Sequence, residues 1–125
     1  MRPYKTAHTE AKTERIINRS RFISQCFPVR SEDEALLRLN EVRKQYPDAT
    51  HVCYAYRIGE LSETTRFSDA GEPSGTAGMP ILEVLKANEL TYVLCTVTRY
   101  FGGILLGAGG LVRAYSSGAA DAGKG

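Results

Sequence analysis

The stretch that decides the expected fold reads RYFGGILLGAGGLVRAY and covers residues 99–115. Five of the chain's twelve glycines lie between Gly102 and Gly110. Glycine weakens helices and strands, so this density indicates a shaped turn with at least one positive φ within residues 107–110. An apolar, β-branched run precedes the turn and apolar residues at helical spacing follow it. The stretch therefore predicts a strand, a glycine-rich turn and a helix.

A turn of this kind can direct backbone N–H groups outward at a helix N-terminus, where the helix dipole favours an anion. Neither familiar phosphate motif matches it. Ala108 and Gly109 occupy the positions of the Lys and Ser/Thr of a P-loop, and Val112 that of the last glycine of the dinucleotide fingerprint. Two interpretations stay open, anion binding and close packing of the turn on the sheet.

Length and composition bound the class of protein. With 125 residues and 42% hydrophobic content, the chain predicts one domain with a substantial core. The net charge of +2 is too small to indicate nucleic-acid binding, although residues 1–30 are clearly basic. Cys26, Cys53 and Cys95 lie in apolar runs without a Cys-x-x-Cys spacing, which indicates buried thiols in a reducing compartment. Since no apolar run approaches the ~18 residues of a membrane span, we expect a cytoplasmic protein.

The remaining patterns predict the other elements. Residues 1–17 are polar, basic and without a period, and indicate an N-terminal arm that is ordered only by docking. Residues 18–125 then form the single domain. Its further strands are expected at 20–30, 50–58 and 64–67. One helix starts at the capping box of Ser31 and Glu34 and stops at Pro47, and another ends at Asn88.

A second glycine-rich stretch, residues 68–80, precedes the helix that ends at Asn88. Asp69 and Glu72 in this stretch could be an acid/base pair or Mg²⁺ ligands. We favour a different role, in which they pair with arginines and fix the loop. His51 has no nucleophile or metal partner at a motif spacing. The sequence therefore predicts no catalytic residue, no metal and no cofactor, and an enzyme is the less favoured interpretation.

Two long motifs carry a resemblance to a known family: FSDAGEPSGTAGMPIL at residues 67–82 and TRYFGGILLGAGGLVRAY at residues 98–115. They strongly resemble the YigZ/IMPACT family, and weaker similarity at residues 20–23 and 51–56 extends it across most of residues 18–120. The family's pattern usually has Asp-Asp-Gly-Glu-Pro, whereas this chain has Ala70 in place of the second acid. That departure weakens a metal-binding version of the loop.

The resemblance implies an α+β fold similar to domain 2 of ribosomal protein S5 and domain IV of elongation factor G: a mixed four-stranded sheet with helices on one face. Eukaryotic relatives act in translational control by competing for the activator of a kinase that senses amino-acid starvation. Bacterial relatives are proposed to contact nucleic acid or the ribosome. The chain resembles the bacterial form, whose second, ferredoxin-like domain we expect to be absent here.

We therefore expect a translation-linked binding module that holds RNA, the ribosome or a translation-control protein. Its anion- or nucleic-acid-binding residues would be Arg66, Ser74, Gly75, Thr76, Arg99, Gly102, Gly103, Gly107, Gly109, Gly110 and Arg113. Phosphate contacts of this kind position a nucleic acid without specifying its sequence. A competing possibility is that Arg99 and Arg113 are internal and pair with the two loop acids.

The alternative from another class is a phosphate- or nucleotide-handling enzyme of the GHMP-kinase-like fold type. Gly109-Gly110-Leu111 with residues 116–120 resembles the glycine/serine loop of those kinases. At 125 residues the chain leaves little room for two substrates. The sequence does not indicate an oligomeric state.

Overall fold

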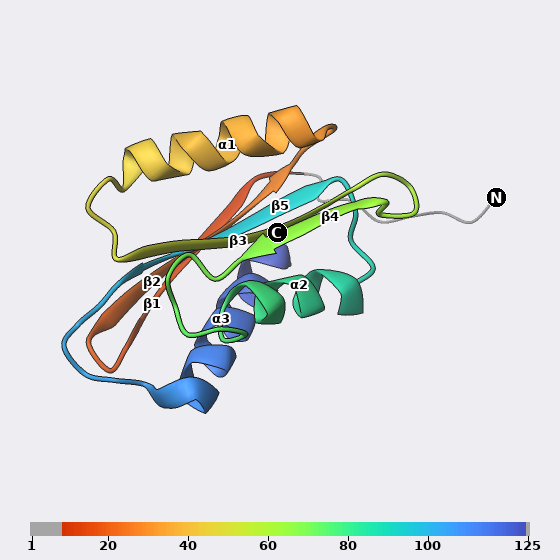
Figure 1. Ribbon diagram of the computed structural model, residues 1–125. Helices are drawn as coiled ribbons and strands as arrows, with labels where there is room; N and C mark the ends of the chain where they lie inside the picture. Colours follow the sequence, from red (N-terminus) through yellow and green to blue (C-terminus); the bar gives the residue numbers. More distant parts are fainter. Residues whose placement is uncertain (1–8, 125) are drawn as a thin grey trace.

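The computed structural model describes residues 9–124. Its strands and helices follow in the order β1 (Ala11–Ile17), β2 (Ser20–Pro28), α1 (Glu32–Gln45), β3 (His51–Ile58), β4 (Thr64–Ser68), α2 (Gly78–Ala87), β5 (Val93–Tyr100) and α3 (Gly107–Gly123). One sheet contains the five strands in the order β1-β2-β5-β3-β4. Figure 1 shows α1 on one face of this sheet and α2 and α3 on the other.

The α+β class is confirmed, but the expected sheet is wrong in strand count and direction. The described strands number five, and every bonded pair is antiparallel. The helix α1 returns the chain so that β3 runs parallel to β2, and α2 does the same for β4 and β5. In each case a strand of opposite direction lies between the two parallel strands. The sheet is therefore antiparallel although helices connect its strands.

The expectation of helices on one face is also wrong, because both faces of the central strands are apolar. On β3, Cys53 and Ala55 pack against the core beneath α2 and α3. Tyr56 and Ile58, on the other face, pack against the core beneath α1. β5 is buried along most of its length. A sheet with two apolar faces needs a helical layer on each.

Residues 11–17 correct the expectation of a separate N-terminal arm, because they form the edge strand β1. They pair with β2 from Ala11 opposite Cys26 to Ile17 opposite Ser20. The hairpin between them has two residues, Asn18 and Arg19, with φ of 48° and 67°, the positive values that match the twist of a tight hairpin. Backbone pairing needs no strong apolar period, which explains why the sequence pattern missed it. Residues 1–8 of the expected arm lie outside the described residues.

Several local predictions are confirmed. The Ser31 hydroxyl accepts a hydrogen bond from the Glu34 N–H at 3.1 Å and caps α1. The Glu34 carboxylate in turn accepts from the Arg30 N–H at 2.6 Å. All three cysteines are buried and free. Within residues 9–124, none of the helices combines the length and apolar character needed to cross a bilayer.

Candidate functional site

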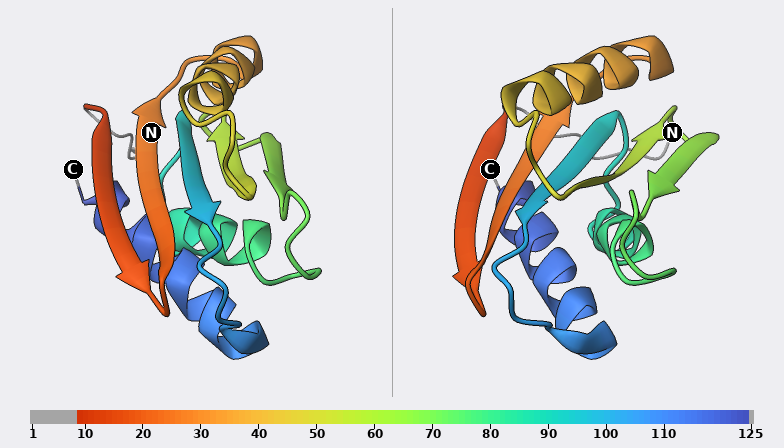
Figure 2. Two further views of the ribbon diagram at one scale, coloured as in Figure 1. Left: turned by 90° about the vertical axis from the view of Figure 1, so that its left-hand side faces the viewer. Right: turned by 60° about the vertical axis from the view of Figure 1, so that its left-hand side comes forward.

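The two glycine-rich stretches become loops at the same end of the sheet, which we call the loop end. Residues 69–77 connect β4 to α2, and residues 101–106 connect β5 to α3. Because β4 and β5 are both antiparallel to β3, their C-terminal ends point the same way. Figures 1 and 2 both show the β5–α3 loop beside the β1–β2 hairpin. The two glycine-rich loops therefore lie at one end of the sheet.

Asp69 holds the first of these loops against the start of α2. Its carboxylate accepts hydrogen bonds from the N–H groups of Gly75 at 2.9 Å, Ala77 at 3.1 Å and Gly78 at 2.8 Å. Partial burial raises the pKa of Asp69, but the three N–H donors outweigh it and hold the pKa below its ordinary value. Since this carboxylate already occupies the N–H groups that an external anion would need, the start of α2 is internally capped.

Glu72 and Arg99 form a buried ion pair between the two loops. Arg99 Nη1 donates to both oxygens of the Glu72 carboxylate, at 3.1 and 2.8 Å. The two residues are only 4% (Arg99) and 8% (Glu72) exposed. The Tyr115 hydroxyl of α3 donates to Glu72 at 2.5 Å, and Arg99 also donates to the Ser20 hydroxyl at 3.1 and 3.3 Å. One carboxylate thus connects β5, α3 and the β4–α2 loop.

His51 and Cys53 of β3 complete this buried cluster. The ring of His51 places Nδ1 2.8 Å from the Ala70 carbonyl and Nε2 3.4 Å from the Glu72 carboxylate. The Cys53 thiol donates to the Asp69 carbonyl at 3.1 Å. Burial raises the pKa of this thiol to about 12, and burial together with neighbouring Cys53 and Glu72 also raises the pKa of the Tyr115 hydroxyl. These protonated groups act as donors that hold the loops in place.

Sequence reasoning missed the contributions of Ser20, His51 and Tyr115 to this cluster. No spacing rule links them, because they come from β2, β3 and α3. The one available signal was that each lies in a stretch that carries the family resemblance.

The three arginines of the expected anion site are not brought together. Arg99 is turned inward and bound to Glu72, so its expected contact with an external anion is corrected. Its guanidinium stabilises a carboxylate that would otherwise be buried without a partner. Arg66 is exposed on the edge strand β4, where it donates to the Thr65 carbonyl. Arg113 is exposed on α3. The internal alternative therefore holds for Arg99 and is wrong for Arg113.

The predicted glycines have different roles. Three of them have a positive φ: Gly75 (+80°), Gly103 (+87°) and Gly107 (+74°). The value at Gly107 confirms the predicted positive φ within residues 107–110. An added Cβ at these three would meet no atom within 4 Å, so they border open space. At Gly102 a Cβ would lie 2.0 Å from the Arg19 carbonyl oxygen, where the hairpin crosses closely. Among the neighbouring polar residues, Ser74 is exposed and Thr76 is buried with its hydroxyl on the Pro73 carbonyl.

Gly109 and Gly110 belong to the first turn of α3, and residues 116–120 lie inside the same helix. The two segments that resemble a kinase glycine/serine loop therefore form continuous helix. The start of α3 has no side-chain cap and no acidic residue in its first turn, whereas α1 has both and the start of α2 is held by the Asp69 carboxylate. Arg113 lies beside it, with Nη1 3.4 Å from the Cβ position of Gly109.

Large apolar side chains are exposed around this helix start. Leu105 is 83% exposed, and three further side chains of the same stretch are 37–45% exposed. Together with the neighbouring cation they form what we call the loop surface: Phe101, Ile104, Leu105, Val112 and Arg113. The described residues contain no group of three His, Cys, Asp or Glu side chains arranged to hold a metal ion.

The fold and the loop end define a small α+β domain in which a buried ion pair joins two glycine-rich loops. The sequence model of the Impact N-terminal domain matches residues 18–122. The chain is 50% identical over 112 residues to the IMPACT family member YvyE of Bacillus subtilis, covering 90% of this chain and 52% of YvyE. It is 43% identical over 104 residues to YigZ of Escherichia coli, covering 82% and 51%. The chain therefore belongs to the IMPACT family.

Solved structures share the fold. A crystal structure described as that of a hypothetical protein has a TM-score of 0.91 and 38% identity, covering 95% of this chain and 59% of the other. The two-domain translational regulator Yih1 has a TM-score of 0.54 at 24% identity, covering 96% and 49%, and shares the fold. The chain spans about half the length of the curated relatives it matches.

Proposed function

We propose that this chain is a translation-linked binding module and that it contacts a translation-control protein through the loop surface. Membership of the IMPACT family supports the link to translation, as does a fold shared with a protein described as a translational regulator.

The observation that carries this proposal is the exposure of Leu105, at 83%, beside Phe101 and Ile104. Exposed apolar side chains are ordinary when scattered, but a contiguous group bordered by polar residues marks an interaction site. The stretch is also held firmly at both ends, by the buried Arg99 before it and the buried Tyr115 after it. A fixed surface loses little conformational freedom when it binds.

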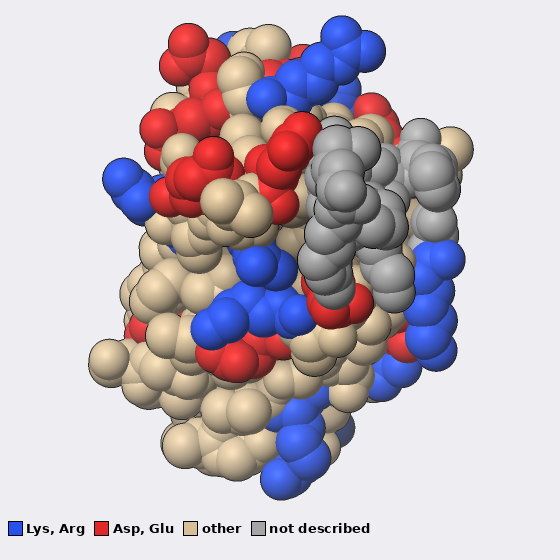
Figure 3. Space-filling model, turned by 90° about the vertical axis from the view of Figure 1, so that its right-hand side faces the viewer, with Lys and Arg blue, Asp and Glu red and all other residues tan. Residues whose placement is uncertain are grey.

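The chemistry of the loop surface indicates the kind of partner. Its apolar side chains require apolar contact, and Arg113 offers one exposed guanidinium at their border. A protein segment with apolar residues next to a carboxylate would satisfy both. Figure 3 shows the side of the molecule away from the loop end, where acidic and basic side chains are mixed in the part that the structure describes. That side therefore offers no continuous basic surface for a nucleic acid backbone.

RNA, free or in the ribosome, is the second candidate, and the uncapped start of α3 favours it. The first turn of α3 has no acid to compete with a phosphate, and Arg113 adds a positive charge beside it. Because Arg99 is internal, such a contact would use fewer arginines than the sequence predicts. If the protein neutralises only a few phosphates of a single-stranded RNA, the binding constant should fall only gently with salt. The slope of its logarithm against that of the salt concentration is about 0.7 per phosphate.

The test measures co-sedimentation of the protein with bacterial ribosomes isolated together with their bound translation factors, which supply both RNA and translation-control proteins. We compare the wild type, Leu105→Asp and Arg113→Gln at two salt concentrations. Leu61→Asp is the matched control, because Leu61 is 86% exposed and lies in the β3–β4 hairpin at the other end of the sheet (Figure 1). We expect Leu105→Asp to weaken binding about tenfold or more and Leu61→Asp to leave it unchanged.

The two candidates give different results. A protein contact depends strongly on Leu105 and little on salt, whereas an RNA contact depends on Arg113 and salt and is reproduced by short single-stranded RNA. Absence of ribosome binding by the folded wild-type protein, or equal loss for Leu61→Asp and Leu105→Asp, would count against the loop surface as the site.

A further inference from the structure

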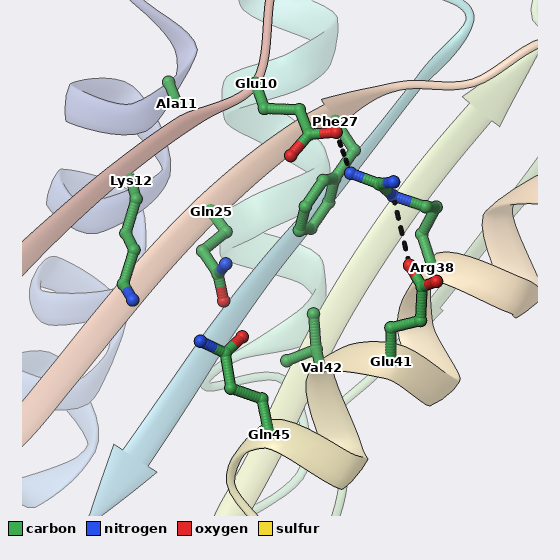
Figure 4. A pocket seen from close by; sticks show the side chains of 9 residues that line it. All are labelled: Glu10, Ala11, Lys12, Gln25, Phe27, Arg38, Glu41, Val42 and Gln45. Carbon is green, nitrogen blue, oxygen red and sulfur yellow. Dashed lines mark hydrogen bonds and ion pairs between the residues drawn. The ribbon is translucent and has the colours of Figure 1, made fainter.

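A pocket on the opposite side of the sheet from α2 and α3 lies between β1, β2 and α1. It has a volume of about 340 Å³, at the small end of the ~300–1,000 Å³ of ligand pockets. Figure 4 shows side chains from all three elements around it. The pocket shares none of its lining residues with the loop surface. An inference about it is therefore independent of the function proposed above.

Gln25 of β2 places an unsatisfied acceptor in this pocket. The residue is 7% exposed, and its Oε1 has no hydrogen-bond partner. Leaving a buried polar atom unpaired costs about 1–3 kcal/mol, so a partner that donates a hydrogen bond is needed there. In Figure 4 the carboxamide of Gln25 points into the same space as that of Gln45, which comes from the end of α1. An external N–H donor would satisfy this acceptor.

The mouth and floor of the pocket limit the ligand further. Lys12, on the neighbouring strand β1, directs its ammonium toward the mouth, where it can donate to an acceptor atom (Figure 4). The Lys12 ammonium lies 5.5 Å from the centre of the Tyr46 ring, and no ion pair joins it to a carboxylate of residues 9–124. Buried Phe27 and Val42 supply an apolar floor. A suitable ligand thus has a flat apolar body and an edge with both a donor and an acceptor.

The far wall of the pocket is held by ion pairs. The guanidinium of Arg38 lies 4.7 Å from the centre of the Phe27 ring. Arg38 is paired with the carboxylates of Glu10 and Glu41. One arginine and two glutamates leave the wall with a net negative charge, which Lys12 on the other side of the pocket balances, so the lining as a whole favours neither a multiply charged anion nor a cation. A neutral ligand matches the pocket better than a free phosphate.

We propose that this pocket binds a nucleobase or a closely similar flat heterocycle, whose N–H donates to Gln25 Oε1 and whose adjacent acceptor receives a hydrogen bond from Lys12. Paired donor and acceptor atoms on one edge are what a carboxamide recognises in a base. The flat body of the heterocycle packs against the side chains of Phe27 and Val42. The same chemistry is present in a free nucleoside and in an unpaired base of RNA.

The test titrates the four ribonucleosides into the folded chain and follows the side-chain amide NMR signals of Gln25 and Gln45. At least one nucleoside is expected to shift both signals saturably in the millimolar range. Methylation that removes the donor, as in 3-methyluridine compared with uridine or N6,N6-dimethyladenosine compared with adenosine, should weaken binding about tenfold, the worth of one hydrogen bond.

Two variants test the pocket from the protein side. Gln25→Leu removes the unsatisfied acceptor without leaving a void, so it should fold and should lose affinity about tenfold. Lys12→Met, at the exposed mouth, should weaken binding severalfold. Lys86→Met is the matched control, because Lys86 lies on α2 on the other side of the sheet and should bind like the wild type.

The source of the base is separated by comparing the nucleoside that binds with a short RNA containing the same base. Binding of both supports an unpaired RNA base as the ligand, and binding of the nucleoside alone supports a free metabolite. The proposal is overturned if no nucleoside shifts the Gln25 signal. It is equally overturned if the methylated nucleosides, or Gln25→Leu, bind as well as their unmodified counterparts, since the pocket would then hold only water.

Discussion

Arg99, at the end of β5, and Glu72, in the loop after β4, are 27 residues apart in sequence and form a buried ion pair. A single guanidinium nitrogen, Nη1, donates to both carboxylate oxygens. The pair lies between the two glycine-rich loops, with the Tyr115 hydroxyl on the same carboxylate. It removes one cation from the surface where the sequence places it. The pair also fixes the start of the β5–α3 loop, which follows Arg99, and the middle of the β4–α2 loop, which contains Glu72.

Breaking this pair should be costly. Arg99→Met leaves the Glu72 carboxylate buried without its cation, and we expect it to lower the free energy of unfolding by about 3–5 kcal/mol. Replacing both residues with methionine should recover part of that loss. Urea unfolding at neutral pH measures each variant. Arg113→Met is the control, because Arg113 is exposed, and a loss for Arg99→Met no larger than for the control would contradict the buried pair.

Asp69 should make the domain sensitive to acid. Its pKa is lower in the folded protein than the ordinary 3.8, so its ionised form stabilises the fold above that pH, and this contribution is lost as the pH falls through the folded pKa. Asp69→Asn should therefore cost about 1–2 kcal/mol at pH 7, the worth of a helix cap. The difference from the wild type should shrink below about pH 4.

Urea unfolding of both proteins across this pH range tests the prediction for Asp69. Asp33→Asn, which alters an exposed acid in the first turn of α1, is the control and should cost less at pH 7. A difference between wild type and Asp69→Asn that stays constant from pH 7 to pH 3 would show that the charge of Asp69 has no part in holding the loop.

Two glycines only two residues apart should respond to alanine with opposite signs. At Gly107, φ is +74°, so Gly107→Ala forces a side chain into the left-handed region and should destabilise by about 1–2 kcal/mol. Gly109 is helical, and its new Cβ would meet only the end of Arg113 at 3.4 Å. Gly109→Ala should therefore stabilise by about 0.5–1 kcal/mol. Thermal unfolding decides, and equal shifts would refute the assigned turn.

The three cysteines should resist thiol reagents in the folded protein. Cys53 is fully buried, and burial raises the pKa of its thiol to about 12; contact with Cys26 and burial raise that of Cys95. Reaction requires the thiolate and access. At pH 8 a disulfide reagent should label the native chain only as fast as it opens, and should label all three thiols in urea.

An exposed engineered thiol provides the control for this labelling. Ser74 is exposed in the β4–α2 loop, so the thiol of Ser74→Cys should react at once while the others stay protected. Rapid labelling of a native cysteine in the wild type would show that the core opens far more readily than its burial indicates.

Local sequence was sufficient wherever neighbouring residues alone decide the conformation. Ser31 and Glu34 predicted the start of α1 because a capping box is completed within four residues. The alternating faces of β3 follow from its sequence in the same way, because the period of a strand is two. The glycines at 102–110 predicted the turn before α3, and the long motifs around them predicted the family.

Only the tertiary structure decided what depends on contacts between distant segments. Residues 11–17 became a strand because β2 offered unpaired backbone groups, and pairing of this kind leaves little trace in side-chain pattern. Arg99 became internal because the loop carrying Glu72 passes beside the end of β5, bringing together charges that are 27 positions apart. In the same way, the sequence determined that Gln25 is polar and lies in a strand, but only the packing of α1 over β1 and β2 encloses its amide in a pocket.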